Sequence, residues 1–127
     1  MKENNFDSTY TEYYESGRLK SVSHFLNNLK NGPFEVHSDR GELLQKGTYK
    51  NGSIDGAIIT FYSSGSKKNE GFYKEGKLDG LLKEYFPDEK LKSESQYKEN
   101  TLNGLTKKYF ENGNISTEEY YLSLIHI

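Results

Sequence analysis

The sequence of 127 residues contains no cysteine and no tryptophan, and it has only two prolines. Without cysteine, neither a disulfide nor a cysteine-based zinc site can form. No stretch approaches the roughly 18 consecutive apolar residues of a membrane span. Residues 1–5 lack the apolar core of a signal peptide. These absences predict a cytoplasmic protein.

An excess of charge of one sign is also missing. The 17 Lys and Arg residues nearly balance the 19 Asp and Glu residues, which leaves a net charge of −2. Because proteins that bind nucleic acid usually carry a clear basic excess, this balance argues against a nucleic-acid partner. Apolar residues are scarce as well, at 32% of the chain. Aromatic residues nevertheless reach 14%, whereas disordered chains are poor in them. We therefore expect a folded chain with a thin core.

What the sequence does contain is a repeat of 24 residues. Asn-Gly or Asp-Gly pairs recur in phase, with their glycines at Gly32, Gly56, Gly80 and Gly104. An aromatic column keeps the same step, at Phe25, Tyr49, Tyr73, Tyr97 and Tyr121. A fixed period of this length is typical of stacked supersecondary units and not of a fold built around a catalytic cleft. The repeat predicts a non-enzymatic scaffold.

Each repeat has the pattern of a strand, a tight turn, a return strand and a longer turn. Tyr and Thr favour strands, and the glycines favour turns. The fold class predicted is all-β, as an elongated single-layer antiparallel meander of about ten strands. The strands are expected near residues 11–15, 18–26, 33–38, 42–50, 57–62, 66–74, 81–86, 91–98, 105–110 and 114–121.

The tight turns are predicted to have two residues. Asn112-Gly113 between two strand-like runs favours a type I′ turn, and Ser16-Gly17 and Ser64-Gly65 are weaker examples. This register pairs Phe110 with Ile115 and Tyr109 with Ser116. The hairpin at residues 87–90 has Glu89 in the glycine position, so we expect it to turn irregularly.

Strand alternation then assigns two faces. The inner face is expected to carry the repeated aromatic column with small residues beside it, namely Ser23, Gly47, Gly71 and Ser95. The same face should hold Leu19, Leu43, Leu91 and Ile115, and the rings of Tyr14, Tyr62, Phe86 and Phe110. The other face is mixed, and we expect it to be the wet one. It carries a second column, which we call the outer aromatic column: Tyr13, His37, Phe61, Tyr85 and Tyr109.

The repeat resembles the bacterial variant of the MORN (membrane occupation and recognition nexus) repeat. Residues 49–56 and 73–80 match its pattern Tyr-x-x-Gly/Asn-x-x-Asp/Asn-Gly. Residues 97–104 match with Asn100 for Gly, and residues 25–32 match with Phe25 for Tyr. The sequence departs from the pattern at Lys30 (an apolar position), Ser38 (an aromatic position) and Glu89 (a glycine position), which puts the regularity of these hairpins in doubt.

The resemblance covers about residues 13–121 and implies a binding or scaffolding element. Bacterial proteins with tandem copies of this variant are commonly described as antitoxin components of toxin–antitoxin pairs, so an antitoxin-like role is one hypothesis. By the same pattern we divide the chain into a degenerate half-repeat (1–12), an array of about four and a half repeats (13–121) and a tail (122–127).

The tail, Leu-Ser-Leu-Ile-His-Ile, breaks both the period and the composition. It matches a translated transposon end that is used in preparing sequencing libraries. We interpret it as non-native, and as a mark of a metagenomic fragment. The alternative is a hydrophobic C-terminal strand.

The sequence gives little support for catalysis or for metal and cofactor binding. The three histidines show no regular spacing of metal ligands. The alternating Asp ligands of a calcium loop are absent, and so are phosphate-loop spacing and a nucleophile elbow. A single-layer sheet also offers little enclosure for shifting the pKa values of a carboxylate pair. We expect no cofactor, no metal site and no catalytic residue.

The outer aromatic column is the candidate binding site. Its predicted cross-strand partners include Lys20, Lys68 and Lys92, which would place cations over the rings. The alternative is that the rings only cover the sheet and stabilise cross-strand pairs. A binding role would suit another protein or, as the second hypothesis, an anionic lipid head group on a peripheral membrane scaffold. The oligomeric state stays open.

Overall fold

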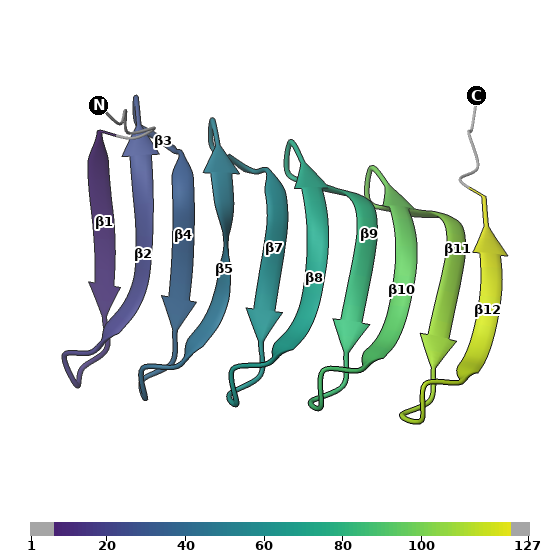
Figure 1. Cartoon of the computed structure of the whole chain (residues 1–127). Helices are drawn as coiled ribbons and strands as arrows, with labels where there is room; N and C mark the ends of the chain where they lie inside the picture. The colour runs from purple at the N-terminus through teal and green to yellow at the C-terminus, as the bar shows by residue number, and fades with distance from the viewer. Residues whose placement is uncertain (1–6, 123–127) are drawn as a thin grey trace, which may run out of the picture.

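The computed structural model describes residues 7–122 as one row of antiparallel strands without a second layer (Figure 1). The strands are β1 (Ser8–Tyr13), β2 (Leu19–Leu26), β3 (Leu29–Lys30), β4 (Gly32–His37), β5 (Leu43–Lys50), β6 (Ser53–Ile54), β7 (Gly56–Phe61), β8 (Lys67–Lys74), β9 (Lys77–Tyr85), β10 (Leu91–Lys98), β11 (Thr101–Tyr109) and β12 (Ile115–Tyr121). The sheet order follows the chain order, with β1 and β12 at opposite ends of the row (Figure 1). The predicted all-β meander is confirmed.

The longer turns contain more structure than the sequence predicts. β3 pairs with β2 and β6 pairs with β5, while β9 and β11 begin early enough to include the equivalent residues. The true two-residue turns lie here. Asn27 and Asn28 both have positive φ (52° and 68°) between the paired Leu26 and Leu29. Positive φ at both central residues is the requirement of a type I′ turn.

Each repeated glycine lies between two stretches of strand pairing. One is the short pairing next to the longer turn, and the other is the main pairing of the two long strands. Tyr73 pairs with Leu78, whereas Gly71 pairs with Leu82, so the register steps by two residues between these pairs. Gly80 lies in that step with φ 131°. Gly32, Gly56 and Gly104 occupy the equivalent position with φ between 99° and 116°. Only glycine adopts such φ values without strain, which explains why the position repeats.

The tight turns differ from the prediction, because they have three residues. In the last one the Phe110 N–H donates to the Asn114 carbonyl (2.8 Å) and the Gly113 N–H donates to the Phe110 carbonyl (2.9 Å). Within this loop only Gly113 has positive φ (92°). A type I turn followed by one left-handed residue has this pattern. An Asn-Gly pair fits this loop as well as a two-residue turn, so the sequence alone did not separate them.

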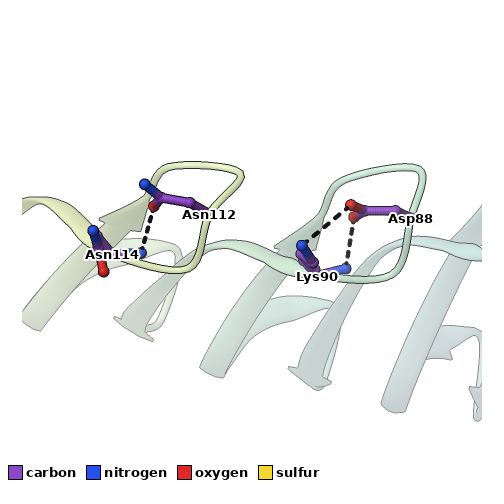
Figure 2. Close-up of polar contacts among 4 residues, drawn as sticks. All are labelled: Asp88, Lys90, Asn112 and Asn114. Carbon is purple, nitrogen blue, oxygen red and sulfur yellow. Dashed lines mark hydrogen bonds and ion pairs between the residues drawn. The ribbon is translucent and has the colours of Figure 1, made fainter.

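The turn at residues 87–89 is regular, contrary to expectation. The Phe86 N–H donates to the Lys90 carbonyl and the Glu89 N–H to the Phe86 carbonyl, as in the other loops. Glu89 takes the left-handed conformation (φ 73°) that glycine takes elsewhere. Figure 2 shows the shared geometry: Asp88 Oδ1 accepts from the Lys90 N–H, as Asn112 Oδ1 does from the Asn114 N–H. This side-chain hydrogen bond forms whether the next residue is Glu89 or Gly113.

A β-bulge follows every tight turn and corrects the predicted register. Lys108 pairs with Thr117 as expected, but Tyr109 pairs with Ile115, so Ser116 is an extra residue. The same shift makes Lys20, Leu44, Lys68 and Lys92 the extra residues of their strands. Because of the bulge, the residue before the extra one lies on the face opposite to the one that regular pairing predicts. Leu19, Leu43, Leu91 and Ile115 therefore lie on the outer face, and not on the inner face as predicted.

The core is thin and lies on the inner face. Phe34 and Ile58 are its buried apolar side chains, and no described side chain is fully buried. Phe34 pairs with Gly47 and Ile58 with Gly71. A Cβ at Gly47 would collide with the Ile58 side chain and lie 2.8 Å from the Phe34 ring. The small residue thus lets the neighbouring side chains lie over the backbone.

Candidate functional site: the outer face of the sheet

The structure places the outer aromatic column along the edge of the sheet where the tight turns lie, and it runs across the strands from β1 to β11. Tyr13, His37, Phe61, Tyr85 and Tyr109 are the last residues of β1, β4, β7, β9 and β11. Each lies just before a tight turn, and strand alternation keeps all five on the outer face. The turns and bulges that follow therefore decide what surrounds them.

The bulges surround the column with aliphatic side chains. Tyr13 pairs with Leu19, His37 with Leu43, Tyr85 with Leu91 and Tyr109 with Ile115. In the middle hairpin Phe61 pairs with Lys67. We call these ten residues the outer strip. Its aliphatic half could not be predicted from the sequence, because no sequence signal distinguishes these bulges from regular pairing.

The three lysines predicted for this face lie on the other one. Lys20, Lys68 and Lys92 place their ammonium groups 5.7, 5.9 and 5.9 Å from the ring centres of Tyr14, Tyr62 and Phe86. The predicted cation–π contacts therefore exist, but with inner-face rings. On the outer face Lys46 lies 6.0 Å from the Phe61 ring centre instead.

The outer strip is less wet than predicted. Tyr13, at the end of the row, is 60% exposed, but His37, Phe61, Tyr85 and Tyr109 are half-buried. Tyr49, Tyr73 and Tyr97 on the inner face are half-buried too. Directly opposite residues of a sheet lie close enough for their side chains to contact each other, so the cross-strand partners contribute to this burial.

A row of mostly charged residues runs beside the outer strip on β4, β5 and β8–β12, with Ile59 of β7 between them. Glu35 pairs with Lys46, Glu70 with Lys83 and Glu94 with Lys107. Lys83 also faces Glu94, and Lys107 also faces Glu118, so the sign alternates from strand to strand between β8 and β12. In the same row His37 Nε2 lies 2.9 Å from Glu35 Oε1. Opposite charges directly across a sheet stabilise it by about 0.2–1 kcal/mol a pair.

Groups suited to catalysis or to metal binding are scarce in residues 7–122. No group of three or more His, Asp or Glu side chains there could hold a metal ion. His24 Nδ1 lies 2.9 Å from the Thr9 hydroxyl, at the edge of the sheet. The Glu119 carboxylate accepts a hydrogen bond from the Tyr121 hydroxyl and thereby raises the pKa of that phenol. This pair is exposed on the last strand and far from any enclosed site.

No helix in the described part of the chain is long and apolar enough to cross a membrane. The residues at both ends, 1–6 and 123–127, lie outside the described part, and with them nearly all of the tail interpreted above as non-native.

The comparison with protein families identifies the repeat. The family described as "MORN repeat variant" matches residues 6–27, 30–51, 78–99 and 102–122. The interval between the second and third matches is filled by β7 and β8, which form the same hairpin with the same loop and bulge. A comparison with curated proteins found no match.

Proposed function

Because this chain belongs to the MORN repeat variant family, we propose that it is a non-catalytic module that binds another protein through the outer strip. MORN repeats are generally protein- or membrane-binding modules. The proposal adds a preference for protein and a specific surface. An antitoxin-like role is the version of this proposal to test first, with a toxin as the protein partner.

The largely apolar character of the outer strip, in which Lys67 is the one lysine, supports the proposal. The bulges turn Leu19, Leu43, Leu91 and Ile115 toward the same face as the aromatic column. Four of the five hairpins thus place an aliphatic side chain beside a ring of the column, and the middle hairpin places Lys67 beside Phe61. An ordinary wet sheet face would be polar at these positions. Aromatic side chains are enriched at interface hot spots, and a stack of repeats presents them as an extended surface.

Charge separates the protein hypothesis from the lipid hypothesis. The row beside the outer strip alternates Glu and Lys, so it presents no basic patch to an anionic membrane. Lys20, Lys68 and Lys92, which could have formed one, lie against inner-face rings. A charge-balanced apolar face suits a protein surface better.

The test removes two rings from the outer strip in Phe61→Ser, Tyr85→Ser. The matched control, Phe86→Ser, Phe110→Ser, removes two inner-face rings at the neighbouring positions. Both variants should keep the strand signal in circular dichroism. The partner protein is sought among the products of adjacent genes, and its affinity is measured by titration calorimetry.

We expect the outer pair to weaken binding at least tenfold and the inner pair to leave it within about twofold. If the outer variant unfolds, the column is core and the proposal fails. The proposal also fails if both variants bind equally, or if only vesicles containing phosphatidylserine are bound, in a flotation assay that salt reverses.

A further inference from the structure

Two hollows of the same construction lie on the outer face, beyond the charged row. The first, of about 320 Å³, is lined by Pro33, Lys46, Thr48, Ala57 and Ile59 among others. The second, of about 210 Å³, is lined by Leu81, Glu94, Gln96, Leu105 and Lys107. Each lining residue of the second hollow stands 48 positions, or two repeats, after one of the first. The two hollows therefore occupy equivalent positions two repeats apart.

The sheet order fixes how the hollows are spaced. The first is centred on β5, between β4 and β7, and the second on β10, between β9 and β11. Four strand spacings separate β5 from β10, which is about 19 Å. Midway lies β8, where Phe72 stands at the position of Thr48 and Gln96 with its side chain 41% exposed. A line drawn across the strands at this position therefore passes over the first hollow, the Phe72 ring and the second hollow.

Size and charge restrict what enters them. Ligand pockets usually measure about 300–1,000 Å³. The first hollow lies at the lower end of this range and the second lies below it, so both suit a single side chain better than a drug-sized molecule. Glu35 and Lys46 border the first, and Glu94 and Lys107 border the second. One cation and one anion at each hollow give no net charge, so an uncharged apolar side chain is the complementary occupant.

The period of the sheet selects the conformation of the partner. Two strand spacings are about 9.6 Å. A polyproline II segment repeats every three residues, or about 9.3 Å, and so keeps residues i, i+3 and i+6 in step with hollow, ring and hollow. An α-helix repeats its face every seven residues, or about 10.5 Å, and drifts by about 2 Å over the same span. A β-strand would turn residue i+3 away from Phe72.

We propose that the partner of the outer face contributes an extended, proline-containing segment that crosses the strands. Bulky apolar side chains at i and i+6 enter the two hollows, and a proline at i+3 covers the Phe72 ring. This inference rests on the proposed function, since it specifies the partner of the same face.

The experiment uses a display library of peptides of about twelve random residues, selected on the whole chain. Enriched peptides should carry two bulky apolar residues six positions apart with proline between them. The consensus peptide is then synthesised, and its affinity is measured by fluorescence anisotropy. A version with the spacing shortened by one residue should bind at least tenfold more weakly.

Variants that fill the hollows test the site. Thr48→Phe and Gln96→Phe each introduce the residue that the fold already accepts at Phe72. The double variant should weaken the consensus peptide at least tenfold, and each single variant should weaken it less. Lys108→Phe, at an exposed inner-face position, is the control and should bind as the original chain does.

The outcomes separate this inference from the proposed function. Failure to enrich a common spacing, enrichment of a helical spacing, or full binding by the filled double variant overturns the inference. If the filled variant still binds its protein partner while Phe61→Ser, Tyr85→Ser does not, the result supports the outer strip as the binding surface and rejects the role of the hollows. If only the filled variant loses the peptide and the partner, the hollows stand and the outer strip does not.

Discussion

At the residue scale, one buried row on the inner face shows how the repeat tolerates change. Phe34, Ile58, Leu82 and Thr106 follow one another at intervals of 24 residues, and each faces a small or polar residue across the strand pair. Thr106 is only 9% exposed, and its hydroxyl has no hydrogen-bond partner in the described part of the structure. An apolar side chain fits that position in three other repeats.

We predict that Thr106→Val raises the free energy of unfolding by about 1 kcal/mol, because it removes an unsatisfied buried hydroxyl without changing the shape. The urea midpoint measures the gain. Thr117→Val, at an exposed position of β12, is the control and should have little effect. A lower midpoint for Thr106→Val would show that the hydroxyl has a partner after all.

The glycines of the inner face differ in how much space they leave. A Cβ at Gly71 would meet its nearest side-chain atoms at 3.1–3.3 Å, whereas at Gly47 the Phe34 ring lies at 2.8 Å and the Ile58 methyl lies closer still. We therefore expect Gly47→Ala to destabilise the protein by about 1–3 kcal/mol, which is typical of overpacking, and Gly71→Ala to cost less. Equal urea midpoints for the two variants would contradict this packing.

At the scale of the element, the hairpin is built by its loop and bulge together. The last residue of each loop is left-handed, at Gly17, Gly41, Gly65, Glu89 and Gly113. The bulge then turns the next residues over, so that an aliphatic side chain reaches the outer face and a lysine or equivalent residue reaches the inner one. The loop and the bulge together therefore determine which face of the sheet the first side chains of the return strand occupy.

Glu89 gives a direct test of the loop. A residue with a Cβ at φ 73° costs roughly 1–2 kcal/mol relative to glycine. Glu89→Gly should therefore raise the unfolding midpoint in urea. The reverse change, Gly113→Glu, should lower it by a similar amount, because the two loops share their hydrogen bonds (Figure 2). Unchanged midpoints in both variants would argue against the left-handed conformation.

At the scale of the whole molecule, hydrogen bonds at both ends of the strands hold successive hairpins together. At the tight turns, the Tyr14 hydroxyl donates to the His37 carbonyl (2.6 Å) and the Tyr62 hydroxyl to the Tyr85 carbonyl (2.7 Å). At the longer turns, backbone donors at Gly52, Gly76 and Asn100 reach the preceding repeat. Stability in such a stack is approximately a sum of repeat and neighbour terms.

Tyr62→Phe should weaken the contact between its hairpin and the next by about 1 kcal/mol, the usual value of one hydrogen bond. Phe86 occupies the equivalent position one repeat later and has no hydroxyl. Phe86→Tyr should therefore add the same bond to the Tyr109 carbonyl and raise the unfolding midpoint in urea. If Tyr62→Phe leaves the midpoint unchanged, the hydroxyl is satisfied equally well by water.

Much of this architecture could be predicted, and the errors have two causes: residues that depart from the repeat pattern were expected to disturb it, and the bulges were not foreseen. The ten long strands and their order follow from the repeat of Gly32, Gly56, Gly80 and Gly104. The departures at Lys30 and Glu89 were expected to disturb their hairpins, yet Lys30 places its ammonium group 5.0 Å from the Tyr49 ring centre and Glu89 keeps the regular turn. The faces of Leu19 and Lys20 were exchanged because alternation was continued through a bulge.

The sequence by itself determined the period, the strand order and the single layer, because these depend on turn residues and on alternation, which are local. The tertiary structure alone decided which side chains share the outer face and where its hollows lie. A β-bulge moves one residue to the opposite face without changing the composition of the strand, and a hollow forms only where residues from three strands meet. The surface that we propose for binding depends on both.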